Sequence, residues 1–284
     1  MRESKGAGIL RVATSNIEPA SRKFLSDGEE IIRDRFIINS HRPQNIMKLN
    51  IKFKLDKQLD KNMTLIFLGS GEKGGVDFSN SVTFYHPELK NVIDSNKEEK
   101  IKFISDYFDK FYKLHRQEFK DLIAKMQSSW KNIEPSFINE LNKTFKDPQK
   151  PNGKYIGYLS AINCNPRFLK DKTYQIFYGH KAGSSYVTVH EVLHFFFYDY
   201  AVKKYPEIFG KLDTNNGIFW DLAELFNAVI MSSEDFMGGK YASITEPYPA
   251  HQKYFDKMKE IWNKNPDIDN WLIEAYGYLS KYNS

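Results

Sequence analysis

The feature that most constrains this chain is the stretch YVTVHEVLHFFFY, which runs from Tyr186 to Tyr198. Apart from Thr188, the side chains around its two histidines and one glutamate are all apolar or aromatic. A helix that is apolar nearly all round belongs in the interior of a protein. Imidazole and carboxylate groups buried there cost several kcal/mol unless they are paired or coordinated. The stretch therefore predicts a buried helix whose polar groups have a specific partner.

The spacing of these polar groups indicates a metal ion as that partner. His190 and His194 are four residues apart, so on a helix their imidazoles project from one face, within reach of a single ion. Glu191 is rotated from His190 by about 100°, which places its carboxylate near the ion's bound water without making it a ligand. Zinc lowers the pKa of such a water towards about 7, and the glutamate can pass its proton to a leaving amine. The alternative is a solvent-facing stripe or a set of core hydrogen bonds.

A tetrahedral zinc ion needs a third protein ligand, which leaves one position for water. The longer pattern HExxHxxGxxH does not apply, because Phe197 and Tyr200 occupy the positions of its glycine and third histidine. The preferred candidate is Glu224, on a largely apolar predicted helix thirty residues after His194. Asp221 shares its face and could be the ligand instead, or accept the outer N–H of a histidine. The alternative for both carboxylates is a solvated acidic edge of an amphipathic helix.

The first part of the chain divides into two regions. Residues 1–44 show no sustained hydrophobic period, so we expect a poorly ordered lead-in with a short helix near Glu29. Residues 45–94 are predicted to be rich in strands, because apolar and polar side chains alternate from Leu49 to Leu55. The segments 64–68 and 81–85 are the predicted neighbours of that strand.

Three glycines between those two segments, Gly69, Gly71 and Gly74, spell the GxGxxG pattern of dinucleotide sites. That pattern needs a helix directly after it to receive the pyrophosphate, whereas a turn and a strand are predicted here. A hairpin loop is therefore the preferred interpretation.

Residues 95–284 are predicted to form an α+β domain, since strands are followed by clustered helices. Helices are expected from a capping box at Ser95 and Glu98 to about Met126, and from Pro135 onward. The other predicted elements are strands at 155–162 and 173–178 and helices at about 185–204, 219–231 and 269–279.

Composition excludes several classes of protein. The chain has 284 residues, is 41% hydrophobic and 15% aromatic, and so should fold with a substantial core, as one domain or two lobes. Its net charge of +5 is spread without dense basic blocks, which argues against nucleic acid as a partner. The single cysteine, Cys164, forbids an intramolecular disulfide. No apolar run suggests a membrane span or a signal peptide, so a cytoplasmic location is the default expectation.

An HExxH pattern followed by a glutamate on a later helix resembles the gluzincin clan of zinc metallopeptidases, the thermolysin-like and minigluzincin group. The similarity covers about residues 154–231 and implies a small sheet whose edge strand, TYQIFY at 173–178, lies along extended substrate and packs on the HExxH helix and the glutamate helix. It also implies that His190, His194 and Glu224 bind one zinc ion per chain and that Glu191 is the general base. In the clan, an acidic residue often stands four positions after the glutamate, and Ala228 occupies that position here. We therefore expect Asp221 or Asn227 to make the hydrogen bonds that orient the metal ligands.

The resemblance also implies a Tyr or His that stabilises the oxyanion, and no motif places it. Among Tyr248, His251 and Tyr254, we select His251 as the candidate catalytic partner of Glu191. The leading hypothesis is hydrolysis of peptide bonds in a peptide or protein substrate. The alternatives are a catalytically silent or latent binding protein on the same scaffold, and zinc-dependent hydrolysis of a non-peptide amide. The oligomeric state is not indicated by the sequence.

Overall fold

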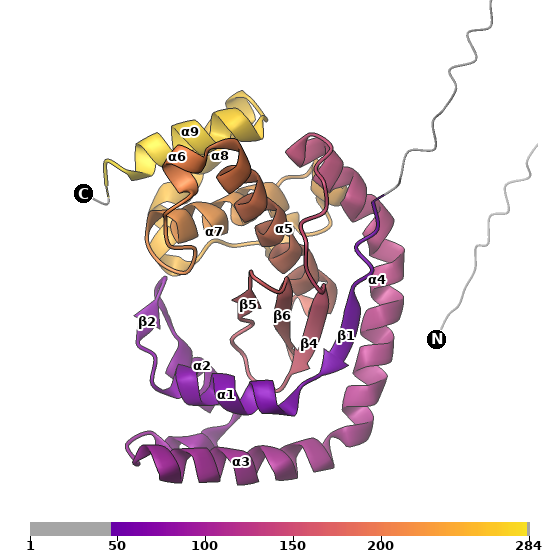
Figure 1. Cartoon of the computed structure of the whole chain (residues 1–284), viewed down its shortest axis with the longest axis vertical. Helices are drawn as coiled ribbons and strands as arrows, with labels where there is room; N and C mark the ends of the chain where they lie inside the picture. The colour runs from indigo at the N-terminus through magenta and orange to yellow at the C-terminus, as the bar shows by residue number, and fades with distance from the viewer. Residues whose placement is uncertain (1–46, 283–284) are drawn as a thin grey trace, which may run out of the picture. The chain divides into compact units, whose positions relative to one another are not determined.

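The computed structural model describes residues 47–282, and Asn45–Ser284 form one compact unit. The predicted lead-in of residues 1–44, with its helix near Glu29, lies outside the described residues. The fold is mixed α+β, mostly helical, with one small four-stranded sheet (Figure 1). The α+β class predicted from the sequence is therefore confirmed. In the part of the chain that is described, no helix is long and apolar enough to cross a membrane.

The sheet has the strand order β1-β4-β6-β5. Its strands are β1 (Lys52–Leu55), β4 (Ile156–Ser160), β6 (Thr173–Phe177) and β5 (Arg167–Phe168). β4 runs parallel to both β1 and β6, and β5 runs antiparallel to β6. Every residue of β6 is buried, as expected for an inner strand of a parallel sheet. The prediction that 173–178 forms the edge strand is therefore wrong, because the short β5 pairs with its outer side.

The prediction of a β-rich region at 45–94 is also wrong. Besides β1, this region contains α1 (Lys57–Leu68), the short strands β2 (Glu72–Lys73) and β3 (Val76–Asp77), α2 (Phe78–Tyr85) and a 3-10 helix (Pro87–Val92). The segments 64–68 and 81–85 are the last turns of α1 and α2. Both helices begin at an aspartate, Asp56 or Asp77, whose side chain accepts a backbone N–H of the first turn. Periodicity over four or five apolar residues does not distinguish a helix from a strand.

The glycine-rich segment does form a hairpin, as predicted. β2 and β3 pair antiparallel, and Gly74 and Gly75 at their turn have φ of 62° and 82°, which glycine adopts at no steric cost. The strand expected after the turn is only Val76–Asp77, and a helix begins at Phe78.

Two helices replace the single long helix expected after Ser95. α3 (Lys97–Leu114) begins after Asn96, which accepts the N–H of Glu99, and α4 (Arg116–Phe145) follows after His115. Pro135 lies inside α4 and does not begin a helix. Buried side chains on both sides of it hold α4 against the core, which offsets the missing N–H; they include Trp130, Ile133, Phe137 and Ile138.

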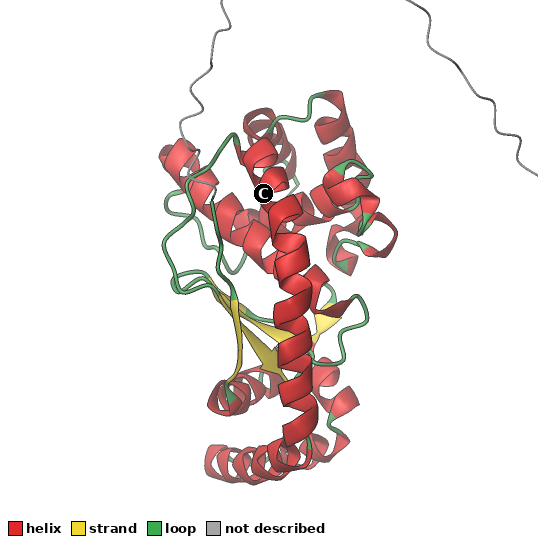
Figure 2. Cartoon of the chain, turned by 90° about the vertical axis from the view of Figure 1, so that its right-hand side faces the viewer, coloured by secondary structure: helices red, strands yellow, loops and turns green. Residues whose placement is uncertain are grey.

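The later elements agree well with the sequence. α5 (Gly183–Lys204), α7 (Ile218–Met231) and α9 (Ile268–Leu279) confirm the three predicted helices, and α6 (Pro206–Phe209) and α8 (Gln252–Lys264) are additional. α5 packs against β6, α4 and α7, and α4 runs past the sheet on the side of β1 (Figure 2). Since α5 is covered on all these sides, its apolar residues from Val187 to Tyr198 are buried. The two helices that carry the predicted ligands therefore lie against each other in the core.

Candidate metal centre

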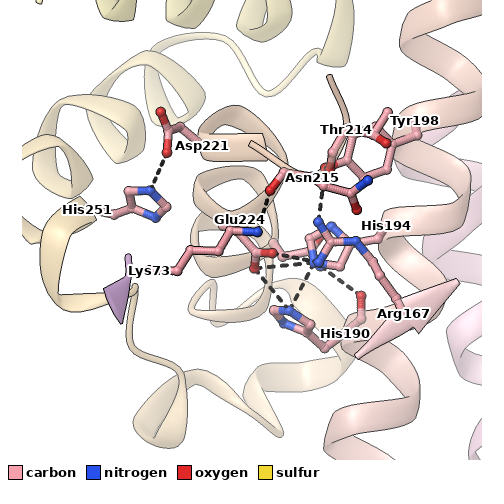
Figure 3. Close-up of polar contacts among 11 residues, drawn as sticks. Lys73, Arg167, His190, His194, Tyr198, Thr214, Asn215, Asp221, Glu224 and His251 are labelled. Carbon is pink, nitrogen blue, oxygen red and sulfur yellow. Dashed lines mark hydrogen bonds and ion pairs between the residues drawn. The ribbon is translucent and has the colours of Figure 1, made fainter. Parts of the chain in front are cut away.

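Three predicted ligand atoms converge between α5 and α7 (Figure 3). Nε2 of His190 and Nε2 of His194 are 3.0 Å apart. Oε2 of Glu224 lies 3.3 Å from each of these nitrogens. The structure thus brings together the three residues that the sequence suggests as ligands, with Glu224 in preference to Asp221.

These separations fit one small tetrahedral ion. Ligand atoms bound to zinc at about 2.0–2.1 Å lie about 3.3 Å apart when their bonds make tetrahedral angles. The three observed edges are 3.0, 3.3 and 3.3 Å. Two imidazole nitrogens and one carboxylate oxygen are also ligand types that zinc commonly takes. The residues present therefore fit a zinc ion with one coordination position left for water or substrate.

Glu224 is oriented by a residue that the sequence did not single out, Arg167 on β5. Its Nη1 donates to Oε1 of Glu224 at 2.7 Å, which turns Oε2 toward the two imidazoles. Its Nη2 donates to the hydroxyl of Tyr198 at 3.0 Å, and that hydroxyl donates to the carbonyl of Thr214. A guanidinium held at both ends in this way keeps the carboxylate in one rotamer.

Burial and neighbouring charges shift the pKa values of the three candidate ligands in different directions. Although burial alone would raise the pKa of Glu224, the Arg167 guanidinium and hydrogen bonding to the two imidazoles hold it well below its usual range. Burial lowers the pKa of His194 to about 3, so its imidazole is neutral at pH 7. Glu224 and His194 are therefore in the protonation states that a metal ion requires of its ligands. Although burial acts in the opposite direction, Glu224 and Glu191 raise the pKa of His190, so a metal ion would have to displace a proton there.

Glu191 follows His190 on α5 and is itself 4% exposed. Its Oε2 is buried and has no hydrogen-bond partner among residues 47–282. Burial raises the pKa of Glu191 to about 7, although His190 and Arg167 act in the opposite direction. A carboxyl group with a pKa near neutrality exchanges protons readily at pH 7, which is the property of an effective general acid–base group.

Of the two residues expected to position the ligands, Asn227 contacts the centre and Asp221 contacts His251. Asn227 donates its Nδ2–H to the backbone carbonyl of His190 at 2.7 Å and so ties α7 to α5. Asp221 lies 2.8 Å from Nε2 of His251, whereas Nδ1 of His194 is buried without a hydrogen-bond partner in the described residues. The hydrogen bonds that position the ligands are therefore made to the Glu224 carboxylate, by Arg167, and to the backbone of α5, by Asn227.

His251 packs against the rings of Trp220 and Tyr248 and is 3% exposed. Figure 3 shows His251 and Asp221 as a pair apart from the three ligand side chains. The role assigned to His251 stays a prediction.

Two residues of the centre were missed from the sequence. Tyr198 continues the four-residue spacing of His190 and His194, and that spacing could have placed it on the same face of α5. Arg167 sits on a two-residue strand and contacts a glutamate 57 residues away, so no local pattern identifies it.

We compared the chain with models of protein families, with curated proteins and with solved structures, and none of the three comparisons found a match.

Proposed function

We propose that this chain is a zinc-dependent metallopeptidase of the gluzincin type. The observation that carries the proposal is the convergence of His190, His194 and Glu224 on one point, with edges of 3.0–3.3 Å. The neighbouring Glu191 carries a buried carboxyl oxygen that the surrounding protein leaves unpaired within residues 47–282. A metal ion and a nearby carboxyl group are the parts needed to activate water against an amide.

Each residue of the centre would have a separate role in the reaction. His190, His194 and Glu224 would hold the ion, and Arg167 would keep Glu224 turned toward it. A bound zinc ion supplies Lewis acidity, which acidifies water and polarises a carbonyl group. Glu191 would take the proton of the attacking water and give it to the leaving amine.

The sheet offers a place for an extended substrate. β5 is one of the two edge strands in the order β1-β4-β6-β5, and edge strands bind extended peptides through main-chain hydrogen bonds. Arg167 belongs to β5 and contacts Glu224, so a peptide paired with β5 would pass close to the candidate metal centre. We therefore propose a peptide or protein substrate.

Metal content and turnover test the proposal separately. The protein is loaded with zinc, dialysed and analysed for metal, and cleavage of a quenched fluorescent peptide library is followed with and without a chelator. We expect one zinc ion per chain and chelator-sensitive cleavage. His190→Ala should lose the metal, because two ligands hold zinc poorly. Glu191→Gln should keep it and lose turnover by a factor of about 10² to 10⁴.

His115→Ala is the matched control, since His115 pairs with Glu118 outside the centre and its loss should change neither readout. The metal site is refuted if His190→Ala retains as much zinc as the unchanged protein. If zinc binds at His190 and no peptide is cleaved, the chain is a metal-binding protein without peptidase activity.

A further inference from the structure

A cavity of about 270 Å³ lies beside the candidate metal centre. Its lining joins parts of the chain that are far apart in sequence, and it includes Phe67, Lys73, Phe78, Arg167, Trp220 and Tyr248. Arg167 belongs to both the cavity and the centre, because it also donates to Glu224. A substrate group that fills this cavity would therefore sit next to the proposed reaction site.

Lys73, on the β2–β3 hairpin, provides positive charge in this cavity. Its Nζ donates to the backbone carbonyl of Asn215 and lies 4.4 Å from the ring centroid of Trp220. Both of these partners are electrically neutral, and the carboxylates of Glu224, Asp213 and Asp221 also act on Lys73 electrostatically. Arg167, by contrast, is already neutralised by Glu224. Figure 3 shows the Lys73 side chain reaching from the hairpin toward Asn215, on the Glu224 side of the centre.

The turn of the β2–β3 hairpin packs tightly against Trp220 and the segment 248–250. The backbone N–H of Ala250 donates to the carbonyl of Gly74 at 3.1 Å. A Cβ on Gly74 would lie 2.8 Å from Tyr248 and 2.9 Å from Trp220, and a Cβ on Gly75 would lie 2.8 Å from Pro249. Because these two residues have no side chain, the turn can approach Tyr248, Trp220 and Pro249 closely, and this packing places Lys73 at the cavity.

We propose that this cavity is a substrate subsite that binds a carboxylate, with Lys73 as the residue that recognises it. The inference rests on the proposed peptidase function and adds a preference in substrate class. A substrate carboxylate at Nζ would form a charge-assisted hydrogen bond, which the Asn215 carbonyl and the Trp220 ring do not provide, in surroundings partly shielded from water by aromatic rings. The carboxylate can come from a Glu or Asp side chain or from the end of a peptide, and the experiment separates these sources.

Peptide binding to zinc-loaded Glu191→Gln protein tests the subsite without turnover. The probes are pools of acetylated, amidated hexapeptides without acidic residues, in which one position is fixed as either Glu or Gln. Binding is measured by competition against a fluorescent pool. At one position we expect Glu to bind about tenfold more tightly than Gln, with the difference reduced by added salt.

In the Glu191→Gln background, adding Lys73→Gln should abolish the Glu preference, measured as the ratio of Glu-pool to Gln-pool affinity in that variant, whereas adding Lys73→Arg should retain it. Lys253→Gln is the matched control, because Lys253 lies 4.7 Å over the ring of Tyr254 outside the cavity. Thermal unfolding of each variant checks that the fold is intact. A neutral pool with a free carboxyl terminus, compared with its amidated form, shows whether the terminal carboxylate is the bound group.

The subsite is refuted if no carboxylate source binds better than its neutral counterpart, or if the preference survives Lys73→Gln. That failure is distinct from failure of the peptidase proposal, which is judged by zinc content and by cleavage of neutral peptides. Cleavage without a carboxylate preference removes only the subsite. A Lys73-dependent preference without cleavage removes only the peptidase activity.

Discussion

At the scale of single residues, Arg167 decides how Glu224 is presented. The two side chains are 12% and 2% exposed and form a 2.7 Å ion pair. Removing the cation from such a buried pair leaves the carboxylate uncompensated, which is far more damaging than losing a pair on the surface. The guanidinium thus both orients Glu224 and keeps it ionised.

Arg167→Met should therefore weaken zinc binding about 10- to 100-fold and lower the free energy of unfolding of the metal-free protein by about 3 kcal/mol. Zinc affinity is measured by competition with a chromophoric chelator, and stability by urea denaturation. Lys146→Met serves as the control, because Lys146 pairs with Asp267 and Asp269 while 48% exposed. Unchanged zinc affinity in Arg167→Met would contradict the role of Arg167.

At the scale of elements, the β2–β3 hairpin shows how a small unit can depend on one backbone conformation. Gly74 has φ of +62°, and the space around its Cα is closed by Tyr248 and Trp220. Gly71, three residues earlier, has no heavy atom within 4 Å of the position of an added Cβ. Two glycines of the same motif therefore differ sharply in how much they constrain the fold.

Gly74→Ala should destabilise the hairpin by about 2 to 4 kcal/mol, because it adds both the left-handed backbone penalty and a steric overlap. Gly71→Ala should change stability by less than about 1 kcal/mol. Hydrogen exchange of the hairpin amides together with urea denaturation measures both variants. Equal protection of the hairpin in the two variants would show that Gly74 is not required for its docking.

At the scale of the whole molecule, a buried carboxyl group connects the sheet to the helices on one side of it. Asp60 of α1 is fully buried. It accepts hydrogen bonds from Tyr112 of α3 at 2.6 Å, from Ser160 at 2.7 Å, from the N–H of Ala161 at 2.7 Å and from Gln175 of β6 at 2.5 Å. Four donors around one residue join the early helices to β4 and β6. This network holds α1, where a strand was predicted at 64–68, and α3 in the same core as β4 and β6.

This carboxyl group makes stability depend on pH. Burial raises the pKa of Asp60 to about 6, above the value of about 3.9 in an unfolded chain. Between these two values the folded state binds more protons, so the free energy of unfolding falls as pH rises from about 4 to 6, by up to about 3 kcal/mol. Asp60→Asn, which does not titrate, should lack this decrease.

Urea denaturation of the unchanged protein and of Asp60→Asn at a series of pH values from 4 to 7.5 measures the difference. Taking the difference cancels the contribution of other titrating groups. Parallel profiles would contradict an elevated pKa for Asp60.

The sequence by itself determined the elements and ligands whose signal is local. Its continuous apolar runs specified α5, α7 and β6, and the four-residue spacing specified that His190 and His194 share a face. Glu224 was also identifiable, because a carboxylate on an otherwise apolar helix needs a partner. Such signals depend only on neighbours within one or two turns, so they are visible before the chain folds.

Only the tertiary structure decided which groups from distant segments meet. Arg167 reaches Glu224 across 57 residues, and Lys73 reaches Asn215 across 142. The helical state of 64–68 and 81–85 and the inner position of β6 depended likewise on partners elsewhere in the chain. Short segments have no period long enough to identify their structure, and burial against distant segments then determines both their conformation and their contacts.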